Sequence, residues 1–271
     1  MSLVTITRSM GCGGSKIASM VADELKLELY DDQRLQQEAI KIGIRSEELK
    51  NLDEKAPGFF DYLRGHKPKA YLDLMEAVVY QVAERGKGII LGHGSQLLLR
   101  DFGCALHVRI YASESSRIRR LMTERGVSEE TAKKLIHKSD HERRGFLRFA
   151  FHMDWNDLSL YDLVLNTEKM AEEGAANLII AAAHSEKIQE CSLTALEAME
   201  RLSLAKRIEA ALLKHNINLV YYHIEVPEKG LAQIRGFTHS EEEKGILLNI
   251  VRQVSGVSSL DDEIAVIPRL V

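Results

Sequence analysis

Short apolar runs rich in β-branched residues set the pattern of the first two thirds of the chain. Runs of this length and composition are typical of strands buried on both faces of a sheet. Segments with apolar residues three and four positions apart lie between them and indicate helices. This alternation predicts a parallel α/β sheet that binds ligands at the carboxyl ends of its strands. The predicted strands are residues 3–7, 88–92, 105–112 and 161–167, and the predicted helices include 15–27, 71–85, 113–126 and 128–151.

The pattern changes after a helix predicted over residues 171–188. A further helix over 201–215 precedes two alternating runs joined by the turn sequence Pro-Glu-Lys-Gly. Ser240 and Glu243 then form the signature of a helix N-terminus, and a last strand follows. We therefore expect two domains, 1–188 and 196–271, the second a small α+β unit with the order αββαβ. No Pro/Gly linker separates them, so the helices at the boundary are expected to be nearly continuous.

Composition narrows the classes of protein that fit. The 271 residues are 45% hydrophobic and 28% charged, which is ordinary for a globular protein, and the net charge of −4 gives no reason to expect nucleic-acid binding. Three cysteines are too few and too uneven for a disulfide framework, so a reducing compartment is expected, with Cys104 and Cys191 as buried small residues. Neither a membrane-spanning run nor a signal-peptide pattern is found, and the expected location is cytoplasmic.

A glycine-rich turn joins the first strand to the first helix and reads RSMGCGGS over residues 8–15. Such a turn directs backbone N–H groups toward one point, where the positive end of the helix dipole favours an anion. Compared with the phosphate-loop pattern G-x-x-x-x-G-K-[ST], Arg8 replaces the first glycine and Gly14 replaces the lysine, while Ser15 keeps the hydroxyl that binds Mg²⁺. Arg8 is therefore the better candidate for the missing charge than Lys16. A glycine-rich turn without a ligand is the alternative.

Two further groups of residues support a phosphate site. Asp31 or Asp32 follows a short predicted strand and is expected near the loop. Arg143, Arg144 and Arg148 lie on a predicted helix, on which Arg144 and Arg148 share a face. Guanidinium groups suit a lid that closes on a transferring phosphoryl group, although a solvated basic helix face would show the same pattern.

Residues 3–185 resemble the cytidylate kinase-like family, a branch of the P-loop nucleoside monophosphate kinases. The motifs are ITRSMGCGGSKIA, LYDD, ILGHGSQLLL, HVRIYASESSRIRRLMTERG and DHERRGFLRFAFHMDWNDLSLYDLVLNT. The resemblance implies a P-loop kinase-type sheet and transfer of the ATP γ-phosphoryl group to CMP or a related small acceptor, with Mg²⁺. It places ATP phosphates at Gly11, Cys12, Gly13, Gly14, Ser15 and Lys16, Mg²⁺ at Ser15, and lid functions at Arg143, Arg144 and Arg148. It places the acceptor or its phosphate near Asp31, Asp32, His93, Arg117, Arg120 and Asp154.

One position departs from the family motif. His93 stands where the family usually has arginine, and histidine is shorter and mostly neutral at pH 7. Loss of an arginine clamp lowers the rate if the clamp stabilises transition-state charge. The alternative function is therefore a catalytically weak or inactive nucleotide sensor.

The region 196–271 resembles a BON domain, through AQIRGFTHSEEEKGILLNIVRQVSGVSSLDDEIAV. A regulatory or dimerising role is favoured over membrane contact, because its charge is negative. A nucleotide is the expected partner of the kinase part, and a homodimer is an open alternative.

Some histidine, cysteine and tryptophan residues could have either a functional or a purely structural role. His137 and His141 have the helical spacing of metal ligands but lack an evident third ligand, so a solvated helix is favoured. Cys12 is interpreted as a small loop residue rather than a redox group. Trp155 is interpreted as packing beneath the lid rather than stacking on a base.

Overall fold

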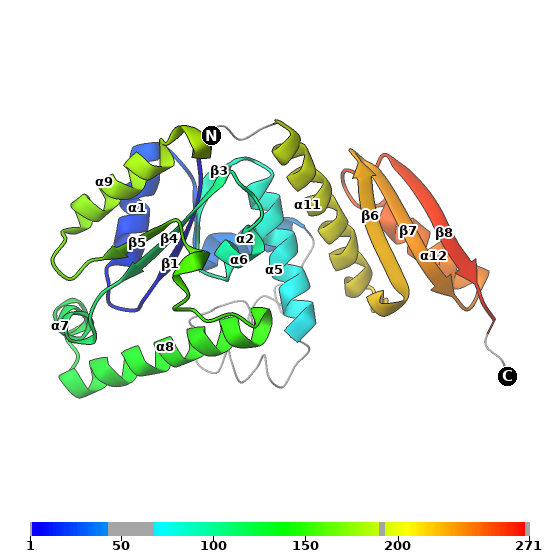
Figure 1. The fold of residues 1–271 in the computed structure, drawn as a ribbon. Coiled ribbons are helices and arrows are strands. Elements are labelled where there is room, and N and C mark those ends of the chain that lie inside the picture. The colour runs from blue at the N-terminus through cyan, green and yellow to red at the C-terminus, as the bar shows by residue number, and fades with distance from the viewer. Residues whose placement is uncertain (1, 43–67, 190–192, 269–271) are drawn as a thin grey trace.

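The computed structural model describes residues 2–42, 68–189 and 193–268. Its larger sheet has five parallel strands in the order β2-β3-β1-β4-β5 (Figure 1). This confirms the predicted parallel α/β fold, since the four long predicted strands all form. The strands are β1 (Ser2–Arg8), β2 (Leu29–Tyr30), β3 (Lys87–Leu91), β4 (Ala105–Tyr111) and β5 (Leu163–Asn166).

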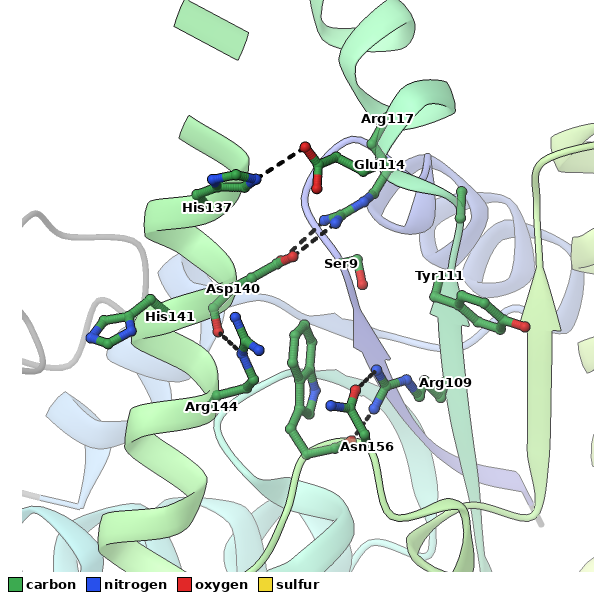
Figure 2. A pocket seen from close by; sticks show the side chains of 12 residues that line it. Ser9, Arg109, Tyr111, Glu114, Arg117, His137, Asp140, His141, Arg144 and Asn156 are labelled. Carbon is green, nitrogen blue, oxygen red and sulfur yellow. Dashed lines mark hydrogen bonds and ion pairs between the residues drawn. The ribbon is translucent and has the colours of Figure 1, made fainter. Parts of the chain in front are cut away.

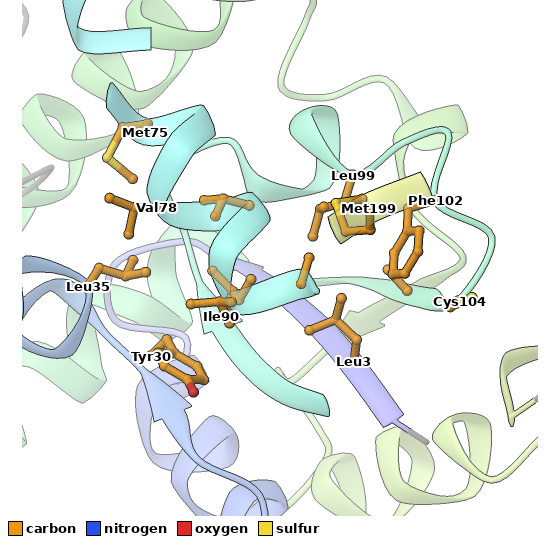
Figure 3. Packing of buried hydrophobic residues seen from close by; sticks show 14 of the residues in the cluster. Leu3, Tyr30, Leu35, Met75, Val78, Ile90, Leu99, Phe102, Cys104 and Met199 are labelled. Carbon is orange, nitrogen blue, oxygen red and sulfur yellow. The ribbon is translucent and has the colours of Figure 1, made fainter. Parts of the chain in front are cut away.

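Helices cover both faces of this sheet. Val4 and Ile6 of β1 pack with Ile17 and Ile179, from α1 and α9, on one face. Leu3 and Ile90 pack with residues of α5, α6 and the end of α8 on the other face (Figure 3). Because successive side chains of a strand point to opposite faces, a strand apolar at every position is buried on both sides. The helices are α1 (Gly14–Leu25), α2 (Asp32–Lys41), α5 (Pro68–Ala83), α6 (Ser95–Leu98), α7 (Glu114–Arg125), α8 (Glu129–Phe151) and α9 (Glu172–Ala183).

A second, three-stranded sheet forms near the C-terminus. Strands β6 (Tyr222–Glu228) and β7 (Leu231–Thr238) are antiparallel, and β8 (Ser259–Val266) is parallel to β7. Helices α11 (Leu193–Lys214) and α12 (Glu241–Arg252) pack on this sheet, which gives the predicted order αββαβ. The predicted start of α12 is also found, because the Ser240 side chain accepts from the Glu243 N–H at 3.1 Å.

Two element boundaries differ from the prediction. The helix expected over 171–188 ends at Ala183, and the separate α10 (Glu186–Gln189) follows it. The first of the two alternating runs, residues 218–226, begins as a 3-10 turn (Leu219–Tyr221) rather than a strand, since the Asn218 side chain accepts from the Val220 N–H at 3.1 Å. Short side-chain caps of this kind compete with strand pairing.

Helix α11 lies between α5 and the second sheet (Figure 1). Met199 belongs to the same apolar cluster as α5, whereas Ile208 and Leu212 belong to the cluster of the second sheet. Lys206 forms ion pairs of 2.8 Å with Glu76 of α5 and with Glu209 of its own helix. One helix therefore contributes to both cores, and the two-domain division at 188–196 remains a prediction.

Cys104 is buried as expected but is disulfide-bonded, so the expectation of a reduced thiol at this position is wrong. Cys191 lies outside the described residues. None of the described helices is long and apolar enough to cross a membrane.

Candidate functional site

The glycine-rich turn forms a loop at the carboxyl end of β1. Gly11 and Gly13 have left-handed φ values of 78° and 79°, which glycine adopts without a steric penalty. Gly13 is the N-cap of α1, and Gly14 and Ser15 form its first turn. The first N–H groups of a helix lack intrahelical partners and carry its positive dipole end. The loop therefore has the backbone shape of an anion site.

Gly14 packs against Arg8. A Cβ at Gly14 would lie 2.6 Å from the Arg8 Cβ and 3.2 Å from the Cys12 sulfur. Arg8 is 4% exposed, so its stem fills the space beside the loop that a larger residue at position 14 would need. This contact explains why glycine stands at the lysine position, whereas the role of Arg8 as the replacement charge remains a prediction.

Lys16 and Arg120 are joined across the loop by Glu172, the first residue of α9. Lys16 pairs with Glu172 at 2.6 Å, and Arg120 pairs with it at 3.2 Å. The hydrogen bond to Glu172 raises the pKa of Lys16, which keeps the ammonium charged. The Arg120 guanidinium occupies the space that a Cβ at Gly13 would fill. Two cations therefore lie beside the loop, although Arg120 comes from α7.

Cys12 is a structural part of the loop. Its thiol is fully buried and donates to the Ile110 carbonyl at 3.5 Å, and Thr167 donates its hydroxyl to the Cys12 carbonyl at 2.8 Å. Burial raises the pKa of the thiol, so the thiolate is disfavoured. The geometry supports the interpretation of Cys12 as a small packing residue.

The three arginines of α8 have different surroundings. Arg143 is buried and donates to the Ser139 hydroxyl at 3.0 Å. Arg144 is exposed and donates to the Asp140 carbonyl at 3.2 Å, and Arg148 is also exposed. Arg143 therefore faces away from Arg144, as helical spacing predicts.

Arg117 connects three parts of the site. Its guanidinium donates to both carboxylate oxygens of Asp140 on α8, at 3.0 and 2.8 Å, and to the Met10 carbonyl in the loop at 3.4 Å. A bidentate arginine–carboxylate pair fixes geometry as well as charge. Arg117, expected to bind substrate, is thus engaged in holding α8 and the loop to α7 (Figure 2).

A cavity of about 600 Å³ opens between the end of β4, α7 and α8. Figure 2 shows Arg109, Arg117 and Arg144 around it. His137 binds Glu114 at 3.0 Å across its rim, and no group of three or more potential metal ligands occurs among the described residues. Its lining is Ser9, Arg109, Tyr111, Ala112, Glu114, Arg117, His137, Asp140, His141, Arg144, Trp155 and Asn156.

Arg109 lines this cavity but is not one of the predicted site residues. It is buried on β4 and donates to the Trp155 carbonyl and to the Asn156 side chain, the latter at 2.9 Å. Its guanidinium lies 4.6 Å from the Trp155 ring centre and 5.5 Å from that of Tyr161. The available signal was a charged residue inside the apolar run ALHVRIYA. Trp155 is 3% exposed, which supports its interpretation as a packing residue.

The remaining predicted site residues are not among those that line this cavity. Asp31 caps α2, accepting from the Arg34 N–H at 2.9 Å. Asp32 and His93 meet at 2.8 Å, between Oδ1 and Nε2. Asp154 shapes a turn by accepting from the Asn156 N–H at 2.9 Å. Direct contact of these residues with substrate remains a prediction.

The model of the cytidylate kinase-like family matches residues 3–169. This range holds nearly all of the five-stranded sheet, together with the glycine loop, α7 and α8. The chain belongs to the cytidylate kinase-like family. The cytidylate kinase of Pyrobaculum islandicum is 25% identical over 180 residues, covering 66% of this chain and 90% of the relative. The cytidylate kinase of Archaeoglobus fulgidus is 25% identical over 193 residues, covering 69% of this chain and 97% of the relative.

A solved structure supports the fold of this cytidylate kinase-like chain. An uncharacterized protein from Eubacterium ventriosum is similar with a TM-score of 0.54 and 23% identity, covering 67% of this chain and 97% of the other. These relatives match about two thirds of the chain. The BON resemblance of the C-terminal region therefore remains a prediction.

The residues of the glycine loop fit the phosphates of a nucleoside triphosphate with Mg²⁺. A Cβ at Gly13 would meet the Arg120 guanidinium and a Cβ at Gly14 would meet the Arg8 stem, so the loop offers its backbone N–H groups with cationic side chains packed beside them. Ser15 is exposed at the start of α1, where its hydroxyl can reach a cation. Mg²⁺ keeps several waters and is held mainly by carboxylates and substrate phosphates. The Ser15 hydroxyl would therefore supply one of its protein ligands.

Proposed function

We propose that this chain is an ATP-dependent nucleotide kinase that transfers the γ-phosphoryl group to CMP or a related small acceptor. The observation that carries the proposal is the placement of an arginine-lined cavity beside the glycine loop. Phosphoryl transfer needs positioning and charge neutralisation rather than a covalent intermediate on the protein.

Each group has a role in this proposal. The N–H groups of Gly11 to Ser15 bind the ATP phosphates, and Arg8 and Lys16 supply the charge that a lysine at position 14 would have given. The Ser15 hydroxyl would hold Mg²⁺, which would supply neutralisation of phosphate charge.

Arg144 and Arg148, exposed on α8, contact the transferring group when the lid closes, and Arg144 then gives up its hydrogen bond to the Asp140 carbonyl. The buried Arg143 holds this part of α8 through the Ser139 hydroxyl. Arg120 positions the phosphates from α7. Arg117 acts indirectly, by holding the loop and α8 through Met10 and Asp140.

Turnover of purified protein tests this function. We expect ADP formation from MgATP with at least one nucleoside monophosphate, and a loss of about 10²–10³-fold in kcat for Arg144→Ala, as for removal of other transition-state donors. Lys133→Ala removes a charge from an exposed position of the same helix and should leave kcat unchanged. ATP binding in calorimetry without turnover on any acceptor would refute the kinase and favour a nucleotide sensor.

For the region 196–271 we propose a BON-like regulatory unit attached through α11. Its order αββαβ supports this reading, and its sheet surface carries Glu225 and Glu263 around Arg235. An acidic surface does not favour anionic lipid. The full chain should therefore stay in the supernatant after centrifugation with phosphatidylserine vesicles, and sedimentation with them would contradict the proposal.

A further inference from the structure

The second sheet has two edges of different character. Strand β6 forms one edge and β8 the other, and among the described residues β7 is the only strand that pairs with β8. The β6 edge lies toward α11, and the β8 edge lies on the far side of the sheet (Figure 1). An edge presents unpaired N–H and C=O groups on which a further strand can be added, unless proline, a bulge, a charged side chain or a covering element prevents it.

The β6 edge is protected against such pairing. Its register with β7 shifts between Glu225 and Glu228, and Pro227 in this irregular part has no N–H to donate. Arg201 of α11 donates to the Pro227 carbonyl, so a helix side chain also covers this end of the strand. A partner strand would therefore not pair regularly along β6.

The β8 edge is regular over its full length. Its eight residues pair with β7 in one unbroken register and include neither proline nor glycine. The N–H groups of Ser259 and Ile267 donate to β7, at 3.1 and 2.8 Å. Because backbone N–H groups alternate in direction along a strand, those of the even-numbered residues point to the outer edge. These residues are Leu260, Asp262, Ile264 and Val266.

The Ile264 carbonyl, which faces the same outer edge, has a side-chain partner. Lys244 of α12 donates to this carbonyl at 3.1 Å and pairs with the Asp262 carboxylate at 2.5 Å. A lysine on an edge hinders pairing, but its ammonium is a compact group on a flexible stem. Because Lys244 also pairs with Asp262, it keeps a charged partner when an added strand takes the Ile264 carbonyl.

The sheet face beside this edge carries carboxylates. Ile264 packs in the core with α12, so the odd-numbered residues of β8 point to the opposite, open face. Asp261 and Glu263 are exposed there. Arg235 of β7 pairs with Glu263 at 3.1 Å and with Glu225 of β6 at 3.8 Å. One guanidinium therefore lies among three carboxylates on this part of the described sheet, which favours a cationic partner.

The same charges disfavour a second copy of this chain on the β8 edge. Pairing β8 with β8 would bring Asp261, Asp262 and Glu263 of both copies into one seam, where like charges repel. A strand with lysine or arginine at alternate positions would instead place cations beside Asp261 and Glu263. Its intervening apolar residues would lie beside Leu260 and Ile264, which belong to the core side of β8.

We propose that the outer edge of β8 binds an extended segment of a partner protein, in which lysine or arginine alternates with apolar residues, as an added strand of the second sheet. Main-chain hydrogen bonds supply affinity in this mode of recognition, and the alternating side chains supply specificity. The edge is separate from the cavity beside the glycine loop, so the proposal stands or falls independently of the kinase function.

Binding of a synthetic peptide tests the proposal. The full chain is titrated in a calorimeter with a peptide of alternating lysine and valine, and with a control peptide in which glutamate replaces lysine. We expect the lysine peptide alone to bind, with an affinity that falls as salt rises. It should slow amide exchange at Leu260, Asp262 and Val266 by at least about 10-fold. Equal affinity for both peptides, or unchanged exchange at these amides, would overturn the proposal.

A second copy is tested without peptide. Sedimentation velocity of the full chain should show no dimer that protects the same β8 amides. A dimer that protects them would overturn the proposal, since the occupant of the edge would then be another copy of this chain.

Paired variants test the contribution of charge. Asp261→Asn combined with Glu263→Gln should weaken binding of the lysine peptide by at least about 5-fold, because opposite-charge pairs across strands are lost. Asp23→Asn combined with Glu24→Gln makes the same change in net charge at exposed positions of α1 and should leave the Kd unchanged. Equal losses in both double variants would show that the peptide responds only to overall charge and would refute the site.

Two substitutions at one position test the edge itself. Asp262→Pro removes an outward N–H that β7 does not use, and proline is tolerated on edge strands in this orientation. It should weaken peptide binding by about 10-fold or more, because a main-chain bond is lost and the ring obstructs the edge. Asp262→Ala keeps the N–H and controls for the lost pair with Lys244, so its Kd should match that of the wild type. Circular dichroism checks the fold of both, and equal affinities for the two variants would refute strand addition.

Discussion

The packing of Arg8 accounts for the glycine at position 14. The lysine typical of a phosphate loop is absent at position 14, and the aliphatic stem of Arg8 lies where a larger side chain at that position would pack. That Arg8, on the strand, supplies the charge that a lysine at the helix start would give remains a prediction. Arginine stays charged even when it is buried, and it is less strongly hydrated than an ammonium group, so it suits this enclosed position.

Substitution of Gly14 tests this contact. Gly14→Ala should lower the free energy of unfolding by about 1–3 kcal/mol, because overpacking against the Arg8 Cβ outweighs the higher helix propensity of alanine. The control is Gly245→Ala in α12, where nothing lies within 4 Å of the added carbon. That variant should gain about 0.5–1 kcal/mol. Urea denaturation measures both, and a gain at both positions would show that Arg8 does not restrict position 14.

His107 lies buried on β4, where its Nδ1 is 2.8 Å from the Thr5 hydroxyl. Burial lowers its pKa, and the Asp162 carboxylate opposes this only in part. The unfolded chain therefore binds a proton more readily than the folded chain below pH about 6.5. The stabilisation is complete above that pH and is lost as the pH falls.

The wild-type Tm should thus decline more steeply between pH 7 and 5 than the Tm of His107→Gln, whose amide keeps a partner for Thr5 and does not titrate. Differential scanning calorimetry at intervals of pH gives the comparison. Parallel profiles would contradict a buried neutral histidine.

At the scale of elements, α7 and α8 act as a joined pair beside the loop. Arg117 links them through Asp140, with both side chains largely buried, at 9% and 16% exposure. The same guanidinium contacts the Met10 carbonyl, so movement of α8 is coupled to the loop. A lid on this scaffold would move as α7 and α8 together.

Asp140→Asn should lower the free energy of unfolding by about 1–3 kcal/mol, since a charged hydrogen-bond partner of a buried guanidinium is lost. It should also speed amide exchange in α8. Glu130→Gln disrupts the exposed Glu130–Lys134 pair of the same helix and should have no measurable effect. Equal exchange rates in Asp140→Asn and the wild type would show that other contacts hold α8.

At the scale of the whole molecule, α11 ties the C-terminal sheet to the kinase fold. Met199 is 4% exposed in the cluster of α5, and Leu212 is fully buried in the cluster of the second sheet. Burial of Lys206 against α5 is balanced by the hydrogen bonds of Glu209 and Glu76, which raise its pKa. A rigid helix with apolar contacts at both ends transmits strain between the two cores.

We therefore expect one cooperative calorimetric transition for the full chain. Met199→Ala and Leu212→Ala should each cost about 2–5 kcal/mol, the range for buried large-to-small substitutions, and each should shift that single transition. Two separate transitions, each shifted by only one variant, would show that the cores unfold independently.

The order of elements and the backbone shape of the loop followed from the sequence alone. Alternating apolar runs, the glycines around Cys12 and the signature at Ser240 are local features, and local sterics and hydrogen bonding decide their structure. The parallel sheet, the αββαβ order and the family were all predicted from them. The predicted end of α9 was less accurate, because apolar residues at helical spacing continue past Ala183, where the helix ends.

Only the tertiary structure decided which charges act together. Arg109 bonds to residues 46 and 47 positions away, Arg117 to Asp140, and His93 to Asp32 at 61 positions. Partners so distant in the chain meet only through the strand order, which no local pattern encodes. The same reason explains why α11 was assigned to one domain but packs in two cores: an apolar residue on a helix signals burial, and the fold alone determines what covers it.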